Sequence, residues 1–255
     1  MNASERTELF KRELSYILDK GIKSFCKTLI MNADDYFFAV PASSSGKYHP
    51  KFALGEGGLV RHTKAVAYFV NEFIRPEIEF GTITRREADL LIASAIAHDI
   101  KKQGDGSEGH TVKEHPGLAS DYIKTTFDEY DWEDKISSDD IYFMCDVVER
   151  HMGPWQEPKP ETRVELILFY ADYIASRKEI VGLDFIDSGD NSEVEAYEKP
   201  VMTVDEYKFD FGKTKGMTIK EAYEANPGYI KWIANKEDFG NDEVQKLVKE
   251  FLKNH

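Results

Sequence analysis

A set of histidine and aspartate side chains on otherwise apolar helical stripes constrains this chain most. In chain order the set is His62, His98, Asp99, His115, His151 and Asp172. Burying so many polar groups is unfavourable unless they share partners, and a divalent metal ion is a partner that both nitrogen and oxygen can share. Four imidazoles and two carboxylates are more ligands than one closed metal site needs, but they suit two ions that share a bridging carboxylate. The set therefore predicts a helical fold that gathers these residues around metal.

Composition narrows the class of protein and its partners. The 255 residues are 41% apolar, enough for one sizeable core and a small second unit. Two cysteines give no disulfide framework, and the charged first residues do not read as a secretory signal, so a soluble cytoplasmic protein without a membrane partner is expected. A net charge of −14 argues against a non-specific duplex binder. It does not exclude a nuclease, because bound metal ions add local positive charge.

Apolar periodicity predicts a helix around each candidate ligand. Helices are expected over residues 5–30, 57–73, 86–99, 139–152 and 161–180, with another beginning at Pro116. The segment 86–99 is rich in alanine and apolar on nearly all faces, which is typical of a helix in the middle of a bundle. Proline suits a first helical turn, so His115 should lie where its helix begins. Each candidate ligand then lies on, or at the end of, an inward-facing helical surface.

The chain is expected to divide at an acidic stretch. Residues 184–206 carry eight acidic side chains against one basic residue, Lys199, and we interpret them as a solvated linker. From Lys208 through Asp210 to Lys213 the sequence begins as a strand-like alternation, and helical segments follow. We therefore expect a mostly α protein: a helical domain over 1–183, a linker over 184–206 and a small α+β module over 207–255.

The ordered set resembles the HD superfamily of metal-dependent phosphohydrolases over roughly residues 50–185. The resembling motifs are Gly-Gly-Leu-Val-Arg-His (57–62), Ala-His-Asp-Ile-Lys-Lys (97–102), Glu-His-Pro (114–116), Glu-Arg-His-Met-Gly (149–153) and Ala-Asp-Tyr-Ile (171–174). Within the superfamily, the likeness is greatest to the HD domain of YhaM-type 3′–5′ exoribonucleases. The resemblance implies an HD-type helical bundle that holds divalent ions, two of them, from among Mn, Fe, Co, Ni, Zn and Mg.

The resemblance also implies a role for each position. A first metal would be held by His62, His98, Asp99 and Asp172. Asp99 would bridge to a second metal, which His115 and His151 complete. Lys102 falls where many relatives carry a lysine and would contact the phosphate, so Asp99 and Lys102 are the expected catalytic residues. Lys101 replaces a glycine of the family pattern, which affects how this loop approaches substrate.

Several residues beside the ligands are candidates for substrate binding. Basic side chains are expected to clamp a phosphate, namely Lys101, Lys102, Arg61, Arg150 and Arg177. Trp155 is expected to stack on a base. For each arginine an outward ion pair is an equal alternative, and for Trp155 the alternative is a packed surface aromatic. For His110, in the glycine-rich loop, we favour a solvent-exposed residue over the alternative of an auxiliary proton donor, and we assign no role to His49 or His255.

Residues 207–240 resemble a small domain found at the C-terminus of exodeoxyribonuclease X-like enzymes. The resemblance rests on Phe-Gly-Lys-Thr-Lys-Gly (211–216) and Pro-Gly-Tyr-Ile-Lys-Trp-Ile (227–233). It implies an accessory role with nucleic acid, for which the candidate contacts are Lys213, Lys215, Tyr229 and Trp232. The alternative is that Phe211, Tyr229 and Trp232 form the module's own core, since so small a domain needs aromatic residues for stability.

These patterns favour hydrolysis of a phosphate ester, with a 3′–5′ nuclease or an oligonucleotide hydrolase acting on single strands as the leading hypothesis. A nucleotide phosphohydrolase acting on dNMPs, dNTPs or cyclic or signalling nucleotides is the first alternative, because a small substrate needs no long basic track. A non-catalytic interaction protein with a degenerate site is the second. The sequence leaves the metal, the substrate and the oligomeric state open.

Overall fold

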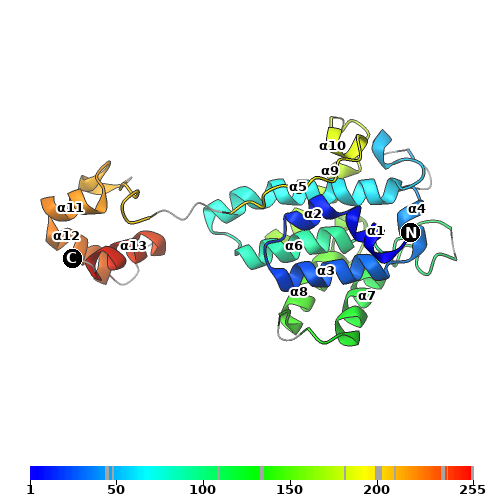
Figure 1. The fold of residues 1–255 in the computed structure, drawn as a ribbon, viewed down its shortest axis with the longest axis horizontal. Coiled ribbons are helices and arrows are strands. Elements are labelled where there is room, and N and C mark those ends of the chain that lie inside the picture. The colour runs from blue at the N-terminus through cyan, green and yellow to red at the C-terminus, as the bar shows by residue number, and fades with distance from the viewer. Residues whose placement is uncertain are drawn as a thin grey trace. The chain divides into compact units, whose positions relative to one another are not determined.

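The chain folds into two compact helical units, Met1–Glu198 and Lys199–His255. The computed structural model describes residues 1–43, 46–47, 49–107, 109–132, 135–180, 182–198, 203–209, 211–236, 239 and 241–253. Helices dominate both units, as Figure 1 shows, and no β-strand occurs within those ranges. The expectation of a mostly α protein is confirmed. None of the helices in the described ranges has the length and apolar character needed to cross a membrane.

The first unit is a bundle whose central helix is α6. Its elements are α1 (Ala3–Glu8), α2 (Lys11–Ser15), α3 (Lys20–Asn32), α4 (Asp35–Ala39), the 3₁₀ turn η1 (Lys51–Ala53), α5 (Gly58–Phe80), α6 (Arg85–Ala97), α7 (His115–Glu129), α8 (Ser138–Glu149), the 3₁₀ turn η2 (Gly153–Trp155), α9 (Arg163–Ala175) and α10 (Asp184–Asp187). Every residue of α6 from Ala88 to Ala97 is buried, and α3, α5, α8 and α9 pack around it. The sequence prediction of a central alanine-rich helix is confirmed.

The expected single helix over residues 5–30 is instead three helices, α1, α2 and α3. The Asp19 carboxylate accepts hydrogen bonds from the Gly21 and Ile22 amides at 2.8 and 2.9 Å, which begins α3. The amides of Leu18 and Asp19 donate to the Asp89 carboxylate of α6 at 3.1 and 2.8 Å. A continuous helix would use those amides internally. The tertiary contact to α6 therefore overrides the local helical pattern.

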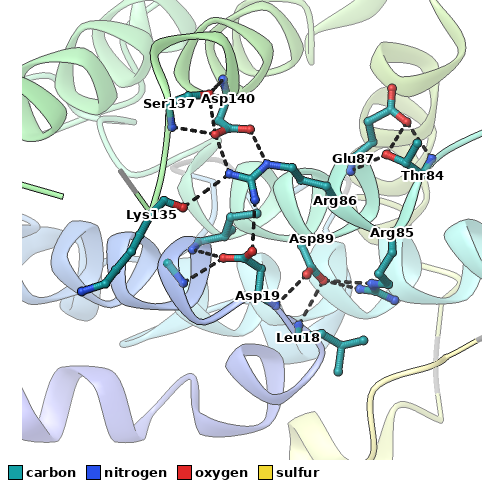
Figure 2. A network of polar contacts seen from close by, with 12 residues as sticks. Leu18, Asp19, Thr84, Arg85, Arg86, Glu87, Asp89, Lys135, Ser137 and Asp140 are labelled. Atoms are coloured by element: carbon teal, nitrogen blue, oxygen red, sulfur yellow. Dashed lines mark hydrogen bonds and ion pairs between the residues drawn. The ribbon is translucent and has the colours of Figure 1, made fainter. Parts of the chain in front are cut away.

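A polar network joins the beginnings of α3, α6 and α8 (Figure 2). The Arg86 guanidinium donates to Asp140 at 2.8 and 2.7 Å and to Asp19 at 3.0 Å. Asp140 also accepts from the amide and the hydroxyl of Ser137, each at 2.7 Å. The network lies at the N-terminal end of α6, whereas His98 caps its C-terminal end. One end of this helix is thus tied to its neighbours, and the other carries candidate ligands.

Part of the acidic segment packs on the first unit. Ile186 and Ala196 are buried, and the Val194 amide donates to the Ser15 hydroxyl at 3.0 Å. Arg85 of α6 donates to the Tyr197 carbonyl at 2.7 Å. Side chains of this segment, among them Phe185, Ile186 and Tyr197, therefore belong to the core of the bundle or pack against it. Lys199 and the three residues after it lie outside the described residues.

The second unit is helical, and the expected α+β module is wrong. It contains the 3₁₀ turn η3 (Gly212–Thr214), α11 (Ile219–Ala225), α12 (Pro227–Asn235) and α13 (Asp242–Lys253). The side chains do alternate between buried and exposed, because Tyr207 and Phe209 enter the core while Lys208 is exposed. Within the described ranges, however, the ladder is a single antiparallel bridge between Lys208 and Thr218. Two glycines with positive φ, Gly212 and Gly216, turn the chain before a strand can extend. Asp210 and His255 lie outside the described residues.

We expect Arg86→Ala to lower the free energy of unfolding by about 1–2 kcal/mol at neutral pH, since it removes charged hydrogen bonds from a half-exposed guanidinium. Burial alone would raise the pKa of Asp140, but the bonds from Arg86 and Ser137 lower it from 3.8 to about 2. Because the folded pKa is depressed, this stabilisation is present above pH of about 4 and is lost as the pH falls towards 2. Urea denaturation across that window measures it, and the variant should show a weaker dependence on acid.

Arg163→Ala is the matched control, because Arg163 pairs with Glu77 while its own side chain is 60% exposed. Its loss should change stability by about 0.5 kcal/mol or less. Equal urea midpoints for the two variants would contradict a stabilising role for the network.

Candidate metal centre

The bundle brings the six candidate ligands to one place. His62 comes from α5, His98 and Asp99 from the turn that ends α6, and Asp172 from α9. His115 is the first residue of α7, and His151 lies two residues beyond α8. The four histidines and Asp99 are no more than 2% exposed, whereas the Asp172 side chain is 18% exposed. The cluster is therefore buried and reaches solvent at Asp172.

The Asp99 carboxylate lies between two groups of imidazoles. Its Oδ2 atom is 3.3 Å from His98 Nε2 and 3.7 Å from His62 Nε2. Its Oδ1 atom is 3.2 Å from His115 Nε2 and 3.7 Å from His151 Nε2. Each oxygen therefore faces a different pair of ring nitrogens, which is the geometry of a carboxylate that can bridge two ions.

Asp172 completes the group on the Oδ2 side. Its Oδ1 atom is 3.0 Å from His62 Nε2 and 3.9 Å from His98 Nε2. Two overlapping triads have all their ligand atoms within 4.8 Å of one another, His62–His98–Asp172 and His98–Asp99–His151. Ligand atoms at about 2.0–2.2 Å from one ion lie roughly 3–3.5 Å apart. The spacings of 3.0, 3.2 and 3.3 Å suit a shared divalent cation, and the other three, at 3.7 to 3.9 Å, are slightly longer.

Backbone carbonyls fix the orientation of three imidazoles. The Nδ1 atoms of His98, His115 and His151 each lie 2.7 Å from the carbonyl oxygen three residues earlier. A ring nitrogen that donates to a carbonyl carries the proton, so Nε2 is left with a lone pair. All three Nε2 atoms lie within 3.7 Å of Asp99. A metal-ligating histidine is oriented by the same kind of contact.

The second group contains acceptors that face one another. His115 Nε2 and His151 Nε2 are 3.2 Å apart, and both rings donate through Nδ1. Two lone pairs therefore meet beside an Asp99 oxygen inside a buried site. This arrangement is unfavourable unless a cation lies among the three atoms. The residues present thus fit a metal ion on chemical grounds.

Electrostatics within the cluster suit metal binding. Burial lowers the pKa of His62, and it lowers the pKa of His151 to about 3, so both rings are neutral at pH 7. Burial would also lower the pKa of His98, but the Asp99 charge raises it. His98 therefore attracts a proton where a cation would bind.

The two carboxylates are ionised. Burial alone would raise the pKa of Asp99, but the Lys102 ammonium and His98 hold it well below its usual range. Hydrogen bonding to His62 has the same effect on the pKa of Asp172. Lys102 forms an ion pair with Asp99 Oδ2, which places its ammonium at the cluster.

The other basic candidates have partners outside this cluster. Lys101 pairs with Asp34 at 2.7 Å and lies over the Tyr122 ring. Arg150 pairs with Asp146 at 3.1 Å and with Glu165 at 3.7 Å. The outward ion pair considered as an alternative for Arg150 is present in the structure.

Arg61 and Arg177 bind backbone carbonyls. Arg61 donates to the Phe52 carbonyl and, at 2.8 Å, to the Leu54 carbonyl. Arg177 donates to the Tyr173 carbonyl at 3.1 Å, and its guanidinium carbon lies 4.3 Å from the centre of the Tyr173 ring. Arg61 therefore holds a loop, whereas Arg177 covers an aromatic side chain.

Trp155 belongs to an exposed aromatic platform, by which we mean Trp155, Tyr173 and Arg177. The Trp155 and Tyr173 rings stack with centroids 5.8 Å apart and an interplanar angle of 13°. Trp155 is 60% exposed and Tyr173 is 37% exposed. A Cβ on Gly153 would lie 2.3 Å from the Phe169 ring, so glycine lets η2 pack closely on α9 and support Trp155.

His49 is a neighbour of the cluster that the sequence does not reveal. Its ring centroid is 5.3 Å from that of His62, and the rings meet edge to face. Both of its ring nitrogens are buried and have no hydrogen-bond partner within the described part of the chain. Burial and the nearby His62 lower its pKa to about 4. His49 lies in an irregular segment, where apolar periodicity gives no signal.

The candidate contacts of the second unit divide into core and surface. Phe211 and Tyr229 pack against the core of that unit. Trp232 is 47% exposed, stacks on Tyr229 with centroids 5.7 Å apart, and lies 4.5 Å from the Lys236 ammonium. The Lys213 and Lys215 side chains are exposed.

Comparison with known proteins identifies a family for part of the second unit. The family described as exodeoxyribonuclease X-like C-terminal matches residues 209–238, which include η3, α11 and α12. Neither the curated proteins nor the solved structures match this chain. The chain therefore carries an exodeoxyribonuclease X-like C-terminal segment, next to an all-helical domain with buried His and Asp groups that could hold metal.

We expect Asp99→Asn to lower the metal content of protein reconstituted with Mn²⁺ from about two ions per chain to about one or fewer, because the amide keeps the shape but removes the shared charge. Elemental analysis after gel filtration measures the content. Asp121→Asn is the control, since Asp121 is exposed on α7. Full metal content in Asp99→Asn would rule out a bridging carboxylate.

Proposed function

We propose that the first unit is a metal-dependent phosphohydrolase of the HD superfamily, which cleaves phosphodiester bonds in single-stranded nucleic acid or oligonucleotides in the manner of a 3′–5′ nuclease. The observation that supports it is the position of the Asp99 carboxylate, with one oxygen towards His62 and His98 and the other towards His115 and His151. A pair of cations bridged by one carboxylate suits displacement at phosphorus, where the attacking and leaving oxygens both need stabilisation.

In this proposal the chain's own residues divide the work. One ion would be held by His62, His98, Asp172 and Asp99 Oδ2, and the other by His115, His151 and Asp99 Oδ1. Bound ions would lower the pKa of a coordinated water and neutralise charge on the phosphoryl oxygens. Lys102, held at the cluster by Asp99, would donate to a non-bridging phosphate oxygen. Asp172, as the most exposed of the six ligands, marks the side from which substrate would approach.

The aromatic platform supports a substrate that contains a base. Trp155 follows His151 by four residues, and Tyr173 directly follows Asp172. An exposed ring held in one orientation offers a face on which a base can stack, and Arg177 adds positive charge beside it. We therefore propose Trp155 and Arg177 as substrate contacts, whereas the salt bridges of Lys101 and Arg150 leave them supporting roles.

The second unit supports the nucleic-acid version of the proposal. Its match to the exodeoxyribonuclease X-like C-terminal family suggests a link to exonucleases. The exposed Trp232, stacked on Tyr229, together with the exposed Lys213 and Lys215, combines aromatic and basic groups that suit a single strand. We propose these four residues as an accessory contact.

The second candidate is a nucleotide phosphohydrolase. The net charge of −14 favours it, because a mononucleotide needs the metal centre and the platform but no extended basic track. In that case the second unit would take no part in binding substrate.

With Mn²⁺, the wild-type protein should hydrolyse labelled single-stranded RNA or DNA, and Asp99→Ala should lower the rate by about 10²–10³-fold or more, because transition-state charge would go unneutralised. A panel of RNA, DNA and nucleotides, run with several metals, measures this. The exposed-site variant Asp121→Asn should keep wild-type rates.

Each other result selects a different function. Phosphate release from nucleotides with intact polymers would establish the nucleotide phosphohydrolase. Less than one equivalent of transition metal and no turnover would favour a non-catalytic interaction protein. Undiminished turnover by Asp99→Ala would place the chemistry elsewhere in the chain.

Trp155→Ala should raise KM for a single strand about 10-fold, because one base loses its stacking partner, while Trp155→Phe should retain most of the affinity. A strand that lacks the base at the contacted position should show no difference between the wild type and Trp155→Ala. Tyr142→Ala is the control, as Tyr142 is 62% exposed on α8. An equal loss on the abasic strand would contradict base stacking by Trp155.

Trp232→Ala should weaken binding of long strands and spare short ones.

A further inference from the structure

The loop between α4 and α5 is fastened to the beginning of α5. Backbone hydrogen bonds join the Leu59 amide to the Val40 carbonyl and the Gly57 amide to the Ala39 carbonyl, each at 2.9 Å. Arg61 adds side-chain bonds to the Phe52 and Leu54 carbonyls. These bonds hold the two ends of the loop together. Arg61, which binds the loop, directly precedes the candidate ligand His62 in the sequence.

Two glycines make this close approach possible. Gly57 has a φ of 69°, a region that favours glycine. A Cβ on Gly58 would lie 2.3 Å from the Ala53 carbonyl oxygen. The Gly-Gly-Leu-Val-Arg-His segment thus docks the loop through its glycines and Arg61, and places His62 beside it.

The docked loop carries His49 to the edge of the metal centre. The His49 ring meets that of His62 edge to face, with centroids 5.3 Å apart. Both of its ring nitrogens are buried without a hydrogen-bond partner in the described structure. Buried nitrogens left unpaired destabilise a protein, so a partner from outside the chain would resolve the arrangement.

The geometry sets His49 apart from the candidate metal ligands. Each of the six candidate ligands has a ring nitrogen or a carboxylate oxygen within 3.7 Å of another ligand atom, whereas His49 meets the group through the edge-to-face contact of its ring with His62. The Nε2 atom of His62 is already directed at Asp172, 3.0 Å away, and at Asp99, 3.7 Å away. His49 therefore lies next to the ligands, where a group bound by the metal ions would be contacted.

We propose that His49 binds the phosphoryl group of the substrate, donating a ring N–H to a non-bridging oxygen on the His62 side of the site. This inference rests on the proposed function. A neutral imidazole always has one N–H to donate. Together with Lys102, His49 would give the phosphoryl group a second donor from the protein itself. His49 would thus be a substrate-binding residue supplied by a loop.

The test compares His49→Phe, which keeps a ring against His62, with His49→Gln, which restores a donor. We expect His49→Phe to lower kcat/KM about 10- to 100-fold, since a hydrogen bond to a charged group is lost, and His49→Gln to recover part of that loss. Calorimetric titration of inorganic phosphate into the Mn²⁺-loaded full chain should show the same ranking. Manganese content should not change, and His110→Phe, at an exposed histidine, is the control.

The outcomes are distinguishable. If His49→Phe also loses manganese, His49 is a metal ligand and the inference is overturned. If its turnover and phosphate affinity equal those of His110→Phe, the phosphoryl contact is absent. If the wild type hydrolyses nothing on the panel, the proposed function fails, while phosphate binding still reports on His49. Circular dichroism and thermal unfolding check that each variant folds.

Arg61 supplies an independent check, as a positioning residue that fastens the loop. Arg61→Gln should weaken phosphate binding to a similar extent, and combining it with His49→Phe should add little further loss. Fully additive losses in the double variant would show that Arg61 acts by another route and would overturn the docking of His49 by this residue.

Discussion

The buried carboxylate of Asp99 is the interaction on which this architecture depends. It lies where α5, α6, α7 and α8 converge, and its oxygens face ring nitrogens contributed by all four. Without compensation, so many buried polar atoms would destabilise the bundle. The Lys102 ammonium compensates on one side only, through Asp99 Oδ2. The opposite side, where His115 and His151 meet at 3.2 Å, is the one that most needs a cation.

Helix ends explain why the ligands are oriented so well. A carbonyl in the middle of a helix is already bonded to an amide, whereas the last carbonyls of a helix have no such partner. His98 and His151 follow α6 and α8, and their Nδ1 atoms take the carbonyls of Ala95 and Val148. The turn geometry thus points carbonyls at the helix ends towards two rings and fixes the tautomer of both, although the Val148 carbonyl also accepts from the His151 amide at 3.3 Å.

The sequence predicts what depends on periodicity and misses what depends on contacts between distant segments. The stripes that carry His62 and Asp172, and the central position of α6, follow from local patterns. The break before Asp19 does not, because an α6 carboxylate takes the amides that a helix would use. The α+β module fails for a related reason, since the alternation buries Tyr207 and Phe209 against helices, and the described residues form one isolated bridge instead of a strand pair. His49 reaches its place through a loop.

In the proposed function, charge sets the selectivity of the candidate site. A chain of net charge −14 repels phosphates as a whole, so binding them requires concentrated positive charge. Lys102 is largely buried and Arg177 covers an aromatic ring, so these two side chains alone supply little of it. Divalent ions at the imidazole cluster would supply the remainder at the point where it is needed. Affinity for phosphate would then depend on metal occupancy, and an empty site would repel the same substrate that a loaded site binds.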